Sequence, residues 1–198
     1  ALSYILLTSI DNASQPQLLQ PFIQSFLPSA LQQRTVPEVT PVEVDGVRLQ
    51  VAGPALLPEA YGFMQRLADV LAQRGTEEQV LNFVKTVWQT AAANPGPLTT
   101  EYFDLINDVL FSALVGSDRP QRVETRPEQL VAARWVFNRL EPEMFEPDIH
   151  GHLLRATLLI LARHGKNEQE VECRRWLPLL LPLRGEPWAV DAIESIIH

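Results

Sequence analysis

The chain has 198 residues, of which 46% are apolar and 20% charged, and this composition excludes an intrinsically disordered protein. Its formal net charge of -8 argues against nucleic acid as a direct partner, because that affinity depends on basic residues that neutralise phosphates. An anionic membrane surface is disfavoured for the same reason. We expect a single helical domain over residues 1–198, with an N-terminal segment, residues 1–56, that carries a β-hairpin.

The cysteine content and the N-terminal residues indicate the compartment. Cys173 is the only cysteine, so an intramolecular disulfide is impossible, which fits a reducing compartment. The apolar run at residues 2–10 lacks the preceding basic residues of a secretory signal. Both features predict a cytoplasmic protein. The run itself is too short for its spacing to decide between strand and helix.

The segment at residues 35–53 predicts a β-hairpin near residues 41–52. β-Branched and other apolar residues alternate with polar ones on both sides of Asp45-Gly46, which is a strong short-range hairpin signal. An isolated hairpin is marginal in water, so it must pack on the helices, pair with residues 2–10 or pair with another chain. Its candidate partner-binding residues are Val42, Val44, Val47 and Leu49.

From Pro58 onward the apolar spacing is helical nearly to the end of the chain. Helix boundaries are predicted at glycines and capping boxes: Gly75, Gly116, Thr76 with Gln79, and Thr125 with Glu128. The predicted fold class is therefore mainly α, an irregular multi-helix bundle of about seven helices with one β-hairpin. The alternative is a short HEAT-like helical stack, because helix pairs begin near residues 58, 100 and 149, at the spacing of about 40–50 residues that such repeats share.

The most apolar helix-length run lies between Asp148 and Gly165, and we expect the rest of the chain to pack around it. Asp148 is predicted as its N-cap and Gly165 as its left-handed C-cap. At about 100° per residue, apolar side chains cover most of the circumference, so the helix needs neighbours on at least three sides. The run is about 16 residues long, against about 20 for a membrane span, and no membrane insertion is predicted. A polar stripe remains: Asp148, His152, Arg155, Arg163 and Lys166.

Acidic residues precede His150 and His152, and such a mixture can hold a divalent metal ion. On a helix, however, the two imidazoles point about 160° apart and cannot share one ion. Only Asp148 and His152 share a face. We therefore predict no metal site and no cofactor.

The tryptophans offer a second kind of site. They line pockets for flat ligands, although they more often fill cores or anchor interfaces. The chain has Trp88, Trp135, Trp176 and Trp188. In a pocket between helices, the polar stripe of the central helix would supply the polar groups. The candidate ligand-binding residues are Asp148, His152, Arg155 and Trp176.

Residues 176–183, WLPLLLPL, form an apolar run that two prolines make irregular. A run this apolar must be buried in its own core or against a partner. Its candidate partner-binding residues are Leu179, Leu180 and Leu181.

Two further features are expected to be structural. Cys173 precedes Arg174 and Arg175, which would stabilise a thiolate, but no catalytic signature surrounds it. We expect a half-buried helix cysteine. An ordinary solvated loop is expected around the arginines Arg119, Arg122 and Arg126.

The sequence contains no glycine-rich nucleotide loop and no GxSxG, HExxH or CxxC motif, which lowers the expectation of an enzyme. We expect a non-catalytic helical protein–protein interaction module, such as an adaptor, assembly factor or regulatory subunit, with a protein partner or self-association. The alternative is a small-ligand or metal-binding protein, or an enzyme, with a pocket between helices near His152.

Overall fold

The computed structural model describes four main stretches of the chain, residues 58–92, 100–116, 125–165 and 170–197. It also describes shorter segments at residues 20, 22–27, 34–35, 40–44, 47–51 and 55–56. Outside the described residues lie the apolar run at residues 2–10 and the side chains named above as Arg119, Arg122 and Lys166.

The described part of the chain contains eight α-helices, so the protein is mainly α, as predicted. These are α3 (Pro58–Arg74), α4 (Glu77–Ala92), α5 (Thr100–Val115), α6 (Leu130–Phe137), α7 (Pro147–His164), α8 (Glu170–Arg174), α9 (Leu177–Leu180) and α10 (Pro187–Ile197). Short helical turns accompany them: η2 (Phe22–Phe26), η3 (Pro127–Gln129), η4 (Pro142–Met144) and η6 (Leu181–Leu183). None of the helices in these stretches combines the length and hydropathy that crossing a membrane requires.

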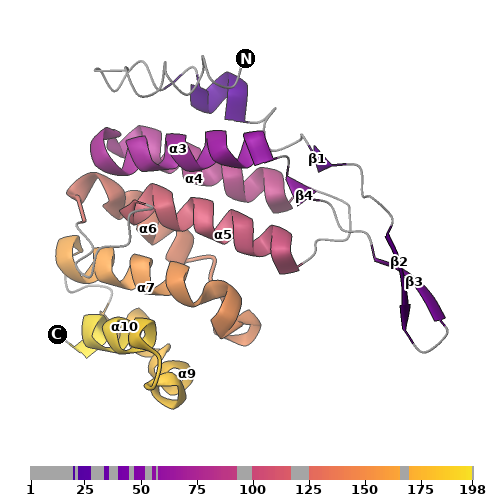
Figure 1. Ribbon diagram of the computed structural model, residues 1–198. Coiled ribbons are helices and arrows are strands. Elements are labelled where there is room, and N and C mark those ends of the chain that lie inside the picture. The colour runs from indigo at the N-terminus through magenta and orange to yellow at the C-terminus, as the bar shows by residue number, and fades with distance from the viewer. Residues whose placement is uncertain are drawn as a thin grey trace.

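The helices lie in successive layers (Figure 1). α3 contacts α5, α5 contacts α7, and α7 contacts α10, so these helices follow one another in a row. α4 contacts α3, α5 and α6, and α6 in turn contacts α7. Each helix inside the row is therefore covered on two opposite sides, which requires apolar residues over more than one narrow stripe.

Short strands occupy part of the N-terminal region. β1 (Arg34–Thr35) pairs with β4 (Ala55–Leu56), and β2 (Thr40–Val44) pairs antiparallel with β3 (Val47–Val51). The Asp45-Gly46 turn and the side chains of these strands lie outside the described residues. The β-hairpin near residues 41–52 therefore stays a prediction, as does its apolar face of Val42, Val44, Val47 and Leu49.

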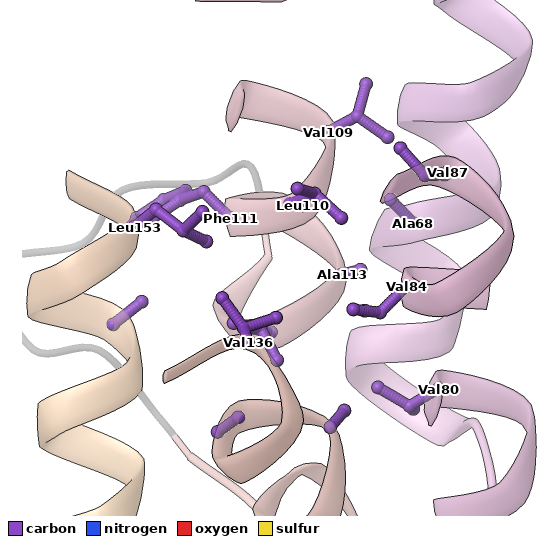
Figure 2. Close-up of a cluster of buried hydrophobic side chains, with 14 of the residues drawn as sticks. Ala68, Val80, Val84, Val87, Val109, Leu110, Phe111, Ala113, Val136 and Leu153 are labelled. Atoms are coloured by element: carbon purple, nitrogen blue, oxygen red, sulfur yellow. The ribbon is translucent and has the colours of Figure 1, made fainter. Parts of the chain in front are cut away.

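A continuous apolar core joins the layers. Figure 2 shows its side chains reaching from Ala68 of α3 and Val84 of α4, through α5, to Val136 of α6 and Leu153 of α7. Burying one large apolar side chain contributes roughly 1.5–3 kcal/mol to folding, so this core is the main stabilising feature of the helical part. The contribution of α5 includes Val109, Leu110, Phe111 and Ala113.

Several helix boundaries lie where the sequence predicts them. Thr76 and Gln79 form the predicted capping box, with the Thr76 N–H donating to Gln79 Oε1 at 3.1 Å and the Gln79 N–H to Thr76 Oγ1 at 3.4 Å. Gly116 follows α5 with a φ of 84°, a left-handed conformation that other residues avoid. Pro58 begins α3, where its missing N–H costs no helical hydrogen bond.

The ends of α7 differ from the prediction. The N-cap is Glu146 rather than Asp148, because Pro147 takes the first helical position, where its fixed φ suits a helix. Gly165 does end the helix, but its φ of -76° is not left-handed, so that part of the prediction is wrong. The need for neighbours on at least three sides is confirmed, since α7 contacts α5, α6 and α10.

The capping box before α6 lies one residue later than predicted. The predicted pair was Thr125 with Glu128, but the Arg126 N–H donates to Oε1 of Gln129 at 2.7 Å. Thr125 Oγ1 lies 2.9 Å from Nε2 of His164 and so joins this turn to the end of α7. Proline at position 127 shifts the helical turn forward by one residue.

Arg126 and Gln129 also cap α3. Arg126 Nη1 and Nη2 donate to the carbonyls of Ala72 and Gly75 at 3.2 and 3.1 Å, and Gln129 Nε2 donates to Ala72 at 3.0 Å. Carbonyls at a helix C-terminus have no partner within the helix, so these bonds satisfy groups that burial would otherwise leave unpaired. The expectation of an ordinary solvated loop is therefore wrong for Arg126.

We predict that Gln129→Ala lowers the free energy of unfolding by about 1–3 kcal/mol, because it removes two hydrogen bonds of a buried side chain. Glu128→Ala is the control. It breaks a 3.2 Å ion pair with Arg126 in which both side chains are partly exposed, and its effect should stay within about 1 kcal/mol. Urea denaturation measures both, and equal losses would contradict a capping role for Gln129.

Gly151 lets α10 approach α7 closely. A Cβ atom at this position would lie 2.8 Å from Cζ2 and 2.9 Å from Cε2 of Trp188. A rigid indole cannot give way as the end of a flexible side chain can, so the absence of a side chain at this position is a packing requirement.

Gly151→Ala should therefore lower the free energy of unfolding by about 1–3 kcal/mol and shift the tryptophan emission, although alanine is the better helix former. Gly62→Ala on α3 is the matched control. No atom lies within 4 Å of a Cβ there, so it should stabilise the protein by about 0.5–1 kcal/mol. If both substitutions stabilise the protein, the close approach of Trp188 does not constrain the fold.

Candidate functional site

A pocket of about 410 Å³ opens beside the connection between α6 and α7. This connection supplies most of the lining, α4 supplies Trp88, and the turn between α8 and α9 supplies Trp176. The volume lies within the range of about 300–1,000 Å³ that ligand pockets usually have. We call this site the aromatic pocket, after its side chains Trp88, Phe145 and Trp176.

The aromatic side chains of the pocket hold one another in place. Trp88 meets Trp135 edge-on, with ring centroids 6.0 Å apart, and Phe145 meets Trp176 edge-on at 5.4 Å. Trp176 is 0% exposed and forms the floor. Its Nε1 is buried without a hydrogen-bond partner among the described atoms, which is uncommon for an indole N–H.

Apolar side chains complete the pocket. Leu140 is buried and Ile149 is half-buried, whereas Met144 is 71% exposed. A methionine side chain is flexible and polarizable, so it adapts its shape to whatever packs against it. An exposed methionine beside aromatic walls is suited to contact with a second molecule.

His150 brings the only imidazole among the described lining residues. Its Nδ1 lies 3.1 Å from the backbone N of Glu146 and accepts that N–H, which requires an unprotonated nitrogen. Burial lowers the pKa of His150, and the nearby Glu146 carboxylate opposes this effect. The ring is therefore neutral at pH 7 and adds no positive charge to the pocket.

The structure does not bring the four predicted ligand-binding residues together. Trp176 lines the aromatic pocket, but Asp148, His152 and Arg155 do not. Asp148 and His152 are exposed, and Arg155 forms an ion pair with Asp191 of α10. The pocket is therefore lined by the face of α7 that carries His150. The predicted residues Asp148, His152 and Arg155 lie on the opposite face.

The residues that the sequence analysis missed lie mainly in the connection before α7. Met144 and Phe145 form an apolar pair in an acidic segment between two prolines. An apolar pair in a loop that is otherwise polar is a signal for a surface site, and it could have directed attention to this segment.

His150 and His152 lie on different sides of α7, as the angular argument predicts. The ring of His150 lies 6.2 Å from Phe145, whereas that of His152 lies 6.2 Å from Phe111 and 6.4 Å from Trp188. Within the described stretches, no three side chains of the types that bind metals are grouped closely enough to hold an ion.

The leucine run divides between the core and the surface. Leu180 is 0% exposed and belongs to the core, Leu179 is half-buried against it, and Leu181 is 48% exposed. The backbone is helical from the end of α9 into η6, so successive side chains of the run point in different directions and only some of them face the core. Leu181 is therefore the member of the predicted set that another molecule can reach.

Cys173 lies on α8 and is buried. Burial and the nearby Glu172 carboxylate raise the pKa of its thiol to about 11, and Arg175 only partly opposes them. At pH 7 the thiol is protonated and a poor nucleophile. This agrees with a structural cysteine, although the side chain is more deeply buried than expected.

No protein-family model, curated protein or solved structure matches this chain.

The neutral state of His150 predicts a pH dependence of stability. Because folding lowers the pKa of His150 below its ordinary value of about 6.5, the unfolded chain binds the proton more readily. The free energy of unfolding should therefore fall as the pH drops from about 7.5 through about 6.5. His150→Gln should weaken this dependence.

His152→Gln is the control, because that histidine is exposed and its ring lies outside the aromatic pocket. Urea denaturation at a series of pH values measures the slope for both variants and the wild type. If His150→Gln leaves the slope unchanged, the folded state does not favour neutral His150.

Proposed function

We propose that this chain is a short, irregular HEAT-like helical stack that acts as a non-catalytic protein–protein interaction module. In this proposal, the aromatic pocket holds a segment of a partner protein. The observation that supports this proposal is an open pocket with aromatic walls. The connection between α6 and α7 adds an exposed methionine and exposed carboxylates to it. Aromatic residues and methionine are the side chains that protein interfaces prefer.

The layered order of the helices supports the stack. In helical repeat proteins each unit contacts its neighbours in sequence, and the stack forms an extended concave surface that binds partners. The contacts from α3 to α5, α7 and α10 follow this order. The short α6 and the broken segment of α8 and α9 make the stack irregular.

The chemistry of the pocket supports binding rather than catalysis. Its described lining residues include no serine, threonine, cysteine or lysine that could act as a nucleophile. The Nδ1 atom of His150 is occupied by the Glu146 N–H, so this histidine has no carboxylate that orients it as a general base. Exposed Met144 and the apolar walls can instead contact a side chain of a partner.

A peptide display library tests this proposal. Random dodecapeptides are selected against the purified 198-residue chain, and the selected peptides are measured against Met144→Glu and Ile197→Glu. Met144 and Ile197 are 71% and 63% exposed, so each variant places a charge on a comparable surface position. We expect Met144→Glu to weaken binding by about tenfold or more, because it removes an apolar contact side chain and places there a carboxylate that loses water when the partner's apolar side chain packs against it. Ile197→Glu should leave binding nearly unchanged.

Leu181→Glu separates the aromatic pocket from the leucine run. If this variant loses binding and Met144→Glu does not, the run at residues 176–183 is the binding surface and the pocket is not. Failure to select any peptide, or equal binding to all variants, would overturn the proposed function.

A further inference from the structure

The carboxylates beside the aromatic pocket form no ion pair with a described residue. Glu141 and Glu146 line the pocket and are both exposed. Glu143, also exposed, lies between them in the same connection.

Arg139, the cation among the described lining residues, is engaged elsewhere. Its guanidinium carbon lies 3.4 Å from the centre of the Trp135 ring, and its Nη1 donates to the Trp135 carbonyl at 3.0 Å. A guanidinium stacked on an indole is held by that ring and by the hydrogen bond. It therefore remains on the Trp135 side while the carboxylates stay unpaired.

The pocket thus presents negative charge next to aromatic faces and apolar side chains. Aromatic faces attract cations through the ring quadrupole, and carboxylates bind guanidinium or ammonium groups through charge-assisted hydrogen bonds. An apolar interior with an acidic edge complements a segment that carries an apolar side chain and neighbouring basic residues. An acidic segment would meet repulsion at the same edge.

We propose that the occupant of the aromatic pocket is a peptide segment of a partner protein in which an apolar side chain is flanked by arginine or lysine. The apolar side chain enters beside Phe145 over the floor formed by Trp176, and the basic side chains pair with Glu141 and Glu146. This inference rests on the proposed function, because it specifies the chemistry of the bound segment. In this inference, Glu141 and Glu146, which contribute to the chain's net charge of -8, attract a basic partner.

Two display libraries of dodecapeptides test the proposal on the full chain. Both have the same apolar residues at the central positions, but one allows only arginine and lysine as charged residues and the other only aspartate and glutamate. We expect enrichment from the basic library alone. Affinity for the enriched peptides should fall when the salt rises from about 0.05 to about 0.5 M, because salt screens exposed charges.

Charge-removing variants locate the effect. The double variant Glu141→Gln with Glu146→Gln should weaken binding of the basic peptides by about tenfold and reduce its salt dependence. The matched control is the double variant Glu172→Gln with Glu194→Gln, which removes two exposed carboxylates that do not line the pocket. Its affinity for the basic peptides should stay within about twofold of that of the wild type.

The outcomes distinguish this inference from the proposed function. If acidic or neutral peptides are selected and Met144→Glu still abolishes their binding, the pocket binds peptides but the basic chemistry is wrong. If the two double variants bind the basic peptides equally, Glu141 and Glu146 do not select them and the inference is overturned. If no selected peptide responds to Met144→Glu, the proposed function itself fails.

Discussion

The burial of α7 on three sides is the constraint on which the rest of the described structure depends. α5, α6 and α10 all contact this helix, and Leu154, Leu158 and Ile160 are removed from water between them. Most polar side-chain atoms that are enclosed in this way form hydrogen bonds within the protein. Thr157 is an example, because its buried hydroxyl donates to the Leu154 carbonyl at 2.8 Å. The apolar surface of α7 therefore determines how its neighbours are arranged.

The aromatic pocket follows from the way α7 begins. Pro147 starts the helix, so the preceding connection runs outside the core with its carboxylates in solvent. Phe145 turns inward at this point and contacts Trp176, and its ring also lies 6.4 Å from that of Trp188. Trp188 is in turn seated against Gly151. The contact between Phe145 and Trp188 thus connects the pocket to α10, and Glu146 lies at the N-cap of α7.

The sequence was informative where a local rule decides the structure. The Thr76–Gln79 capping box and the glycine at the end of α5 depend on residues that are close in the chain. The enclosure of α7 is made by distant helices, but the apolar residues around its own circumference predict it. Local rules failed where a proline moved the boundary. Pro147 moved the N-cap from Asp148 to Glu146 in this way.

The candidate site was harder to predict than the helices. Helical spacing separates the faces of His150 and His152, but it does not say which face meets Trp88 and Trp176. That depends on contacts between residues far apart in the chain, such as Phe145 with Trp176. Trp176 lines the aromatic pocket, whereas Asp148, His152 and Arg155 share a stripe of α7 that lies outside it. Asp148 and His152 are exposed, and Arg155 pairs with Asp191 of α10.

The cap on α3 has a consequence for the order of folding. The hydrogen bonds from Arg126 and Gln129 to the end of α3 span 51 to 57 residues of sequence. As the chain emerges from the ribosome, α3 and the capping box of α4 can form from local contacts alone. The last turn of α3 must then wait for residues 126–129 before its carbonyls gain these partners. Closing such a long loop is slow compared with helix formation, so the C-terminus of α3 is completed later than the helix itself.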